Sequence, residues 1–323
     1  MPADFSAGAI LRIRITPADV GKRVSVRQLT PITDGHHTFT DTVGVLASWD
    51  DGVVCVTRRD GQTVRIPQEA LVAGKVVPPA PARRAGRVPA VTARELEERA
   101  SRAWPATRTE PLGGWTLRAA GGFTRRANSV LATGDPGLPL DEALAAVLRW
   151  YGERGLPPLV QLPDDSPHAA ALAARGWTSE ADTVVRTAPL APLAVLPAGP
   201  VELSRTPPEG WLRAYHRTGG LAEEAVKVVT GGPSVWFASA PGAIGRAVVD
   251  GPWALFGAVE VEPEQRRRGL ATAVMGALAR QAYQEGATAA YLQVEADNEG
   301  ARTLYDRLGF TDHHHYRYWR PAA

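Results

Sequence analysis

Residues 253–272 read WALFGAVEVEPEQRRRGLAT. The segment Trp253–Val261, apolar except for Glu260, is predicted to be a strand, and Gly269 ends the polar turn that follows it. The next segment, Leu270–Gln284, places its apolar side chains on one stripe at helical spacing. A strand, a glycine turn and a helix in this order predict a mixed α/β domain.

The start of that helix is a predicted anion-binding site. The first N–H groups of a helix have no partner within the helix, and the helix dipole adds partial positive charge beside them. Gly269 lets the backbone approach a phosphate without a Cβ in the way, and Ala271 is small enough for close packing under a ligand. A larger side chain at either position is expected to block the site.

Two motifs carry a resemblance to a known superfamily. Arg266-x-x-Gly269-x-Ala271 after a strand resembles the Arg/Gln-x-x-Gly-x-Gly/Ala signature of the GNAT N-acetyltransferases. Asn298, Ala301, Tyr305, Gly309 and Phe310 follow where that superfamily shows N-x-x-A-x-x-x-Y-x-x-x-G-F. The resemblance covers residues 200–323 and implies an acetyltransferase that uses acetyl-CoA.

The resemblance also implies where acetyl-CoA binds. The strands ending at Val261 and Val294 are expected to splay and hold the pantetheine arm, while the turn cradles the pyrophosphate. The expected cofactor-binding residues are Val259, Val261, Arg266, Arg267, Arg268, Gly269, Leu270, Ala271, Thr272 and Asn298. For the three arginines, side-chain contact with phosphate and a merely solvated turn both remain open.

A general base is expected on the strand. An amine attacks a thioester only when neutral, and a lysine-like amine has an ordinary pKa of ~10.4, so a base must help to remove its proton. Glu260 and Glu262 lie two residues apart and should project to the face opposite Val259 and Val261. We assign Glu260, acting directly or through water; the alternative is a solvated charge at the strand edge.

The other catalytic roles follow from the resemblance and from the chemistry. Tyr305 stands where many GNAT enzymes place a tyrosine that gives a proton to the departing CoA thiolate; the alternative is a core aromatic. A backbone N–H near Val259 or Val261 is the expected donor to the acetyl carbonyl oxygen, on which charge develops during the attack.

The middle of the chain repeats the order of the last block. Helix 140–149, strand 159–162, helix 167–175 and strand 182–187 match helix 270–284, strand 290–294, helix 300–308 and a final strand to 319. We interpret this as a duplication, with chance similarity as the alternative. No phosphate-turn pattern occurs in the segment Asn128–Gly137, so the middle block is predicted to be a degenerate half without its own cofactor.

The first block is patterned as strands, at 11–15, 23–27, 42–48, 52–57 and 63–66, with Asp-Gly turns at 51–52 and 60–61. It resembles a small closed SH3-like β-barrel. Proline-rich stretches at 78–89 and 189–200 separate the blocks. The predicted fold class is therefore α/β (α+β): an SH3-like barrel (1–78), a degenerate GNAT half (90–190) and a catalytic GNAT half (197–323), each half with a mixed sheet.

The composition of the chain limits which partners and which cell compartment are expected. Lys+Arg 36 against Asp+Glu 34 gives a net charge of +2, which does not favour nucleic acid. The single cysteine, Cys55, excludes an intrachain disulfide, and no run approaches the ~18 apolar residues of a membrane span. These features predict a cytoplasmic protein. Its expected partners are acetyl-CoA and an amine acceptor, either a small molecule or a protein or peptide, and the chain is expected to be a monomer or homodimer.

Several other segments have both a functional and a purely structural interpretation. No metal site is expected at His313-His314-His315, because adjacent strand residues point to alternate faces. The glycine- and arginine-rich stretch Gly113–Asn128 lines a substrate pocket between the halves or forms an ordinary hairpin. Helices at 211–217 and 221–229 should cover the acceptor site. The alternative function is a non-catalytic acyl-CoA sensor or a protein-binding module that uses the barrel; a third interpretation makes the barrel the functional module and the GNAT halves a scaffold.

Overall fold

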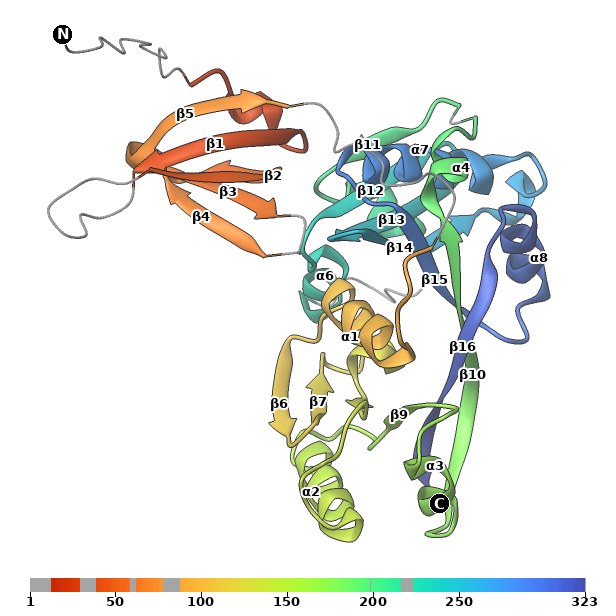
Figure 1. Ribbon diagram of the computed structural model, residues 1–323. Coiled ribbons are helices and arrows are strands. Elements are labelled where there is room, and N and C mark those ends of the chain that lie inside the picture. The colour runs from red at the N-terminus through yellow and green to blue at the C-terminus, as the bar shows by residue number, and fades with distance from the viewer. Residues whose placement is uncertain are drawn as a thin grey trace, which may run out of the picture. The chain divides into compact units, whose positions relative to one another are not determined.

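The computed structural model describes residues 13–29, 39–58, 62–77, 88–197, 199–215 and 223–322. The chain forms two compact units, one made mainly of residues 1–81 and one of residues 82–283 and 287–323. Figure 1 shows strands dominating the first unit and a mixture of helices and strands in the second. No helix in the described ranges is long and apolar enough to cross a membrane.

The first unit is an antiparallel sheet in the order β4-β3-β2-β1-β5. Its elements are η1 (Pro17–Asp19), β1 (Arg23–Leu29), β2 (Phe39–Asp50), β3 (Val53–Arg58), β4 (Thr63–Pro67), η2 (Gln68–Ala70) and β5 (Leu71–Val76). Asp51 and Gly52 adopt φ of 49° and 73°, as the predicted Asp-Gly hairpin turn requires. One apolar core holds the sheet together: Ile15, Val24, Val26, Leu46, Val54, Val56, Ile66 and Leu71.

Four of the five predicted strands are confirmed as β1 to β4. The prediction at 11–15 is wrong in its described part, because Ile13 makes only a single bridge to Gly74; residues 11 and 12, like the turn at 59–61, lie outside the described ranges. The fifth strand is β5, whose sequence lacks the alternation that identifies a half-buried strand. The edge strands are β4 and β5, and closure into a barrel stays a prediction.

The second unit contains one mixed sheet in the order β11-β12-β13-β14-β15-β10-β16-β9-β8-β7-β6. The middle block supplies β6 (Arg108–Leu112), β7 (Trp115–Ala119), β8 (Val130–Leu131), β9 (Val160–Pro163) and β10 (Trp177–Pro189). The last block supplies β11 (Glu202–Ser204), β12 (Val235–Ala240), β13 (Ala243–Asp250), β14 (Trp253–Val261), β15 (Ala289–Glu295) and β16 (Thr311–Pro321).

The helices of this unit include six that follow the predicted order and two that were not predicted, at 93–103 and 190–194. They are α1 (Ala93–Ala103), α2 (Leu140–Gly152), α3 (His168–Ala173), α4 (Leu190–Ala194), α5 (Glu209–Ala214), α6 (Glu223–Thr230), α7 (Leu270–Gln284) and α8 (Glu299–Arg307), with 3-10 turns η3 (Arg125–Ala127) and η5 (Pro263–Gln265). The predicted bounds of α7 are confirmed, and α2, α3 and α8 differ by a few residues. Of the predicted helices at 211–217 and 221–229, residues 216–222 lie outside the described ranges.

The two blocks share their sheet by exchanging final strands. Strand β10 of the middle block pairs with β15, and β16 of the last block pairs with β9. Figure 1 shows the long strands β10 and β16 running side by side. Each block also contains one parallel pair, β8–β9 and β14–β15, at the corresponding place in its order of elements. This correspondence supports a duplicated α/β layout.

Two apolar clusters cover opposite faces of the last block. One contains Trp211 and Val228 with Trp253 of β14, and the other contains Val274 and Leu278 of α7. Helix α7 packs closely on β13, because a Cβ at position 245, now glycine, would lie 2.4 Å from Val274 Cγ1. The start of α7 is thereby fixed against the sheet, one short turn after β14 ends.

Candidate active site

The site begins where β14 and β15 separate. They pair in parallel only from Trp253 opposite Ala289 to Phe256 opposite Leu292. Two residues later, Ala258 has φ of 49°, and the β13–β14 register shifts between Ile244 and Arg246. A left-handed alanine costs about 1–2 kcal/mol, so the surrounding structure must hold this bulge in place. The result is a fork between two strands, which the resemblance led us to expect.

The bulge sets the directions of the side chains on β14. Phe256 and Val259, three residues apart, both pack in the α7-side cluster, whereas regular alternation would put them on opposite faces. Glu260 lies opposite Ile244, which belongs to the cluster on the other face. Glu260 therefore faces away from Val259 and Val261, as expected.

The bulge also directs the backbone of β14. The Glu262 N–H donates to Gly242 O across a distance of 2.9 Å, toward the β13 edge. Because successive strand residues direct their N–H groups to alternate edges, the N–H groups of Val259 and Val261 point to the β15 edge, into the fork. Beyond Phe256 the structure records no β15 partner on this edge. These are the two N–H groups named from the sequence as donors.

The turn after β14 leads directly to the start of α7. Gly269 has φ of 80°, and a Cβ built there would meet no atom of the described residues within 4 Å. The first intrahelical bond runs from Ala273 N to Gly269 O, at 2.9 Å, so the N–H groups of Leu270, Ala271 and Thr272 precede the helical ladder. This open approach to a helix start has the shape that a phosphate requires.

The three arginines of the turn are exposed. Arg266 Nε donates to Val261 O at 3.3 Å, and an Nη of Arg268 donates to Gln265 Oε1 at 2.6 Å. Arg267 takes a left-handed φ of 61°. Two of the three side chains therefore brace the turn itself, and each guanidinium keeps further N–H groups for a ligand.

The second motif forms α8 and the turn after it. Asn298 Oδ1 accepts from Ala301 N at 3.1 Å and caps the helix, which occupies this side-chain oxygen. Tyr305 is half-buried in the α7-side cluster, with its ring 5.8 Å from that of Phe310. Burial raises the pKa of Tyr305 to about 12, although the nearby charge of Arg186 acts in the opposite direction. The hydroxyl is therefore protonated at neutral pH.

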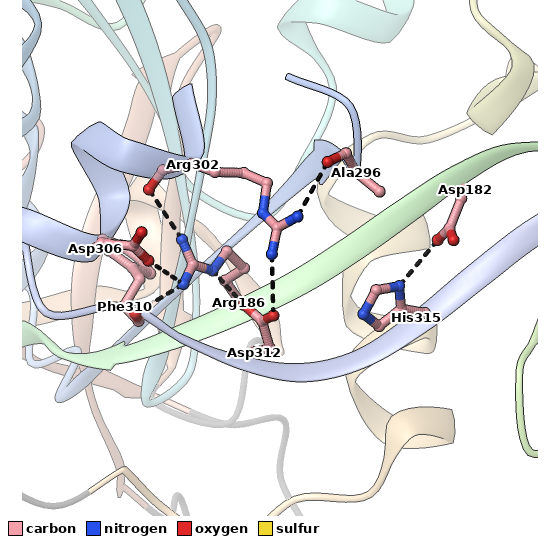
Figure 2. A network of polar contacts seen from close by, with 8 residues as sticks. All are labelled: Asp182, Arg186, Ala296, Arg302, Asp306, Phe310, Asp312 and His315. Carbon is pink, nitrogen blue, oxygen red and sulfur yellow. Dashed lines mark hydrogen bonds and ion pairs between the residues drawn. The ribbon is translucent and has the colours of Figure 1, made fainter. Parts of the chain in front are cut away.

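Sequence reasoning missed Arg186, which lies on β10 of the middle block. Figure 2 shows its guanidinium surrounded by acceptors from α8 and β16. Its side chain is nearly buried, and it pairs with Asp306 and Asp312 at 2.6 Å each. The available signal was a charged residue directly after Val184 and Val185 in a predicted strand, but no local pattern identifies its partners.

The histidine run contacts several elements. His313 Nε2 lies 3.1 Å from Val91 O, His314 Nε2 lies 3.1 Å from Glu97 Oε1, and His315 Nδ1 lies 2.9 Å from Asp182 Oδ1. Among the described residues, no group of three potential ligands is placed to hold a metal ion. These histidines connect β16 to α1 and β10.

The stretch Gly113–Asn128 has structural roles at two of its polar residues. Arg118 is buried and donates to Ser129 and Gln161, and Asn128 accepts from Ala120 N and Gly122 N. Arg125 pairs with Glu180 on β10. These contacts support the hairpin interpretation for Arg118 and Asn128, whereas a substrate pocket between the halves stays a prediction.

Helix α6 brings two acidic residues to the face opposite α7. Glu223 is exposed and pairs with Lys227 at 2.7 Å, as a solvent-facing helix residue does. Glu224 carries a buried oxygen, Oε2, for which the described residues offer no hydrogen-bond partner.

Family models match most of the chain. One described as "Probable histone acetyltransferase Rv0428c C-terminal" matches residues 91–319, and one described as "Rv0428c N-terminal Sm-like domain" matches residues 18–75. The second match agrees with a small N-terminal β domain.

Individual proteins give the same result. "Probable histone acetyltransferase Rv0428c" of Mycobacterium tuberculosis is 32% identical over 312 residues, which cover 93% of this chain and 94% of that protein. "Uncharacterized N-acetyltransferase YobR" of Bacillus subtilis is 28% identical over 256 residues, covering 69% and 97%. A solved GCN5-related N-acetyltransferase from Kribbella flavida shares the fold, with a TM-score of 0.54 at 18% identity over 72% of this chain and 96% of that one. The chain therefore belongs to the GNAT superfamily, within the Rv0428c family, and is an acyltransferase of the GNAT type.

Proposed function

We propose that this protein transfers an acetyl group from acetyl-CoA to the amine of an acceptor by direct attack within a ternary complex. The observation that carries the proposal is the fork of β14 and β15, which opens beside the uncovered start of α7. A thioester in the fork and a pyrophosphate at the helix start are the two ends of one extended ligand. Bound acetyl-CoA supplies the activated acetyl group.

The turn residues bind the phosphates in this proposal. The N–H groups from Gly269 to Thr272 point toward the anion, and the arginines add positive charge around them. The open space at Gly269 allows the closest approach of backbone to phosphate. The N–H groups of Val259 and Val261 receive the carbonyl oxygen in the fork, where each donor stabilises the charge that develops.

Glu260 and Tyr305 act from opposite sides of the sheet. Glu260 faces the side covered by α5 and α6, where it takes a proton from the acceptor amine, directly or through water. Tyr305 faces the α7 side, where its hydroxyl gives a proton to the leaving thiolate. No covalent acetyl-enzyme is needed, because the acceptor amine attacks the thioester directly.

The acceptor is an amine of a small molecule, a peptide or a protein. The name of the Mycobacterium tuberculosis relative indicates a histone as its acceptor, so we include lysine-containing basic peptides among the amines to test. The single cysteine suits a reducing compartment such as the cytoplasm. The alternative function, acyl-CoA sensing without turnover, predicts cofactor binding without release of CoA.

A calorimetric titration with acetyl-CoA tests the binding site, and an assay of free CoA thiol with an amine panel tests the transfer. We expect one site per chain and loss of binding in Gly269→Asp. Gly176→Asp is the matched control, because Gly176 has φ of 78° and equally open surroundings in the other half of the unit. Equal losses in both variants would assign the effect to backbone strain. Two binding sites would contradict a degenerate middle half, and binding without thiol release would favour a sensor.

A further inference from the structure

Arg186 lies level with the opening of the fork. In the β10–β15 pair it is opposite Leu292, the last β15 residue that also pairs with β14. Directly opposite residues of neighbouring strands share a face, and Leu292 belongs to the cluster on the α7 side. The side chain of Arg186 therefore projects on the same face as Tyr305.

The Arg186 guanidinium links the end of α8 to the start of β16 by hydrogen bonds (Figure 2). Nη2 donates to Asp306 Oδ1 at 2.6 Å and to Phe310 O at 3.1 Å, while Nη1 donates to Arg302 O at 3.2 Å. Nε donates to Asp312 Oδ1 at 2.6 Å. A planar guanidinium can bind acceptors in four directions at once, whereas an ammonium cannot reproduce that geometry. A cation near the last turn of a helix also interacts favourably with the helix dipole.

These partners surround Tyr305 along the chain. Asp306 follows it directly, Arg302 precedes it by one helical turn, and Phe310 both stacks edge-on against its ring and donates its N–H to Tyr305 O at 3.0 Å. Helix α8 has no fully buried residue of its own. Ala301 and Tyr305 of α8 pack only partly buried on the α7-side cluster. Two of the four Arg186 hydrogen bonds reach α8 itself, at Arg302 O and Asp306 Oδ1, and the other two reach Phe310 O and Asp312, so this one nearly buried arginine links the helix to the strand that follows it.

We propose that Arg186 is a positioning residue for Tyr305: the middle block supplies it through β10, and it fixes the end of α8 so that the Tyr305 hydroxyl is held at the fork. This inference rests on the proposed role of Tyr305 as proton donor. It gives the middle half a function in catalysis although that half has no phosphate turn of its own.

A double-mutant cycle tests the inference. Arg186→Lys keeps the charge but loses the four-way geometry, and we expect kcat to fall about 10-fold, a part of the roughly 10²–10⁴-fold that a positioned acid contributes. The KM for acetyl-CoA should change less than about 2-fold, because the phosphate turn is intact. In the Tyr305→Phe background, Arg186→Lys should change kcat by less than about 2-fold, since residues that act as a unit are not additive. If Arg186→Lys lowers kcat by the same factor with tyrosine and with phenylalanine at position 305, the inference is overturned.

Two further variants separate positioning from folding. Asp306→Asn keeps an acceptor oxygen but removes the negative charge of an exposed partner of Arg186, and we expect a smaller fall in kcat that again depends on Tyr305. Arg118→Lys changes an equally buried arginine whose partners, Ser129 and Gln161, lie outside α8. If Arg118→Lys lowers kcat, it should do so by the same factor with tyrosine and with phenylalanine at position 305. Thermal melts of all variants identify those that are only less stable.

A spectroscopic measurement reads the position of Tyr305 without turnover. With fluorotyrosine incorporated at the seven tyrosines, the signal missing from Tyr305→Phe belongs to Tyr305. In Arg186→Lys we expect that signal to shift or broaden while the others stay. An unchanged signal overturns the inference even if no acceptor is acetylated. A shifted signal in a protein without turnover supports the placement of Tyr305 by Arg186 and contradicts the catalytic role that the proposed function gives to Tyr305.

Discussion

Phe256 and Leu292 are the last residues of β14 and β15 that lie opposite each other. Past this pair the strands separate, and Ala258 turns the chain through a left-handed bulge. The fork, the two N–H groups directed into it and the orientation of Glu260 all follow from this one departure from regular pairing.

The bulge predicts an unusual response at Ala258. Glycine adopts positive φ without the clash that costs other residues about 1–2 kcal/mol, so Ala258→Gly should be at least as stable as the wild type. Ala258→Val should lower the free energy of unfolding by about 1–3 kcal/mol, because a branched side chain is more strained there. Urea unfolding measures both. If Ala258→Gly is less stable than Ala258→Val, the backbone at position 258 is not strained as we infer.

The close packing of α7 predicts sensitivity at Gly245. A Cβ there would lie 2.4 Å from Val274 Cγ1 and 3.2 Å from Leu278 Cδ1, so Gly245→Ala must shift these α7 side chains, or the helix that carries them, away from the sheet. We expect a loss of about 1–3 kcal/mol in the free energy of unfolding, together with a higher KM for acetyl-CoA. Gly152→Ala is the control, because no atom lies within 4 Å of a Cβ at Gly152. Equal behaviour of the two variants would refute the packing argument.

Glu260 and its neighbour Glu262 allow a controlled test of which residue is the general base. Glu260→Gln keeps the size of the side chain and should lower kcat at neutral pH by about 10²–10⁴-fold. The loss should shrink as the pH rises, because solvent then deprotonates the amine. Glu262→Gln changes an exposed neighbour and should leave kcat near the wild-type value. Initial rates from pH 6 to 10 compare the variants, and similar rates for both would reject Glu260.

The pKa of Tyr305 predicts how kcat depends on pH in the alkaline range. Burial raises this pKa to about 12, so the hydroxyl keeps its proton through the usual assay range. Tyr305→Phe should therefore lower kcat by a constant factor from pH 6 to 10 and leave the shape of the profile unchanged. A wild-type alkaline limb near pH 9 that disappears in the phenylalanine variant would show that the pKa of Tyr305 is much lower.

The contacts of Asp182 between β10 and β16 predict that the stability of the fold depends on pH in the acid range. Burial would raise the pKa of Asp182, but hydrogen bonds from His315 (Figure 2) and from Arg317, both on β16, outweigh this effect and lower the pKa below its ordinary value. A carboxyl whose folded pKa is depressed stabilises the fold above its unfolded pKa, and this contribution is lost as the pH falls through the folded pKa. The wild type should be more stable than Asp182→Asn at pH 6, and the difference should narrow below about pH 4. A difference that is constant from pH 6 to 3 would contradict the linkage.

Much of the site is local in the sequence and could be predicted from it. The strand, the glycine turn and the helix from Trp253 to Gln284 are neighbours along the chain, and their periodicity and the special conformation at Gly269 determine them before any long-range contact forms. The same holds for α8, whose cap at Asn298 and terminal Gly309 are sequence signals. The GNAT motifs lie in these segments, so they indicated the superfamily.

Long-range pairing decided the rest. The exchange of β10 and β16, the pairing of β5 with β1 and the register that ends at Phe256 and Leu292 depend on contacts between residues far apart in the chain. Arg186 and Asp306 are separated by 120 residues, and no local pattern in either segment identifies the other. Periodicity reports which face of an element is apolar, but the competition among possible partners for that face is settled only when the whole sheet assembles.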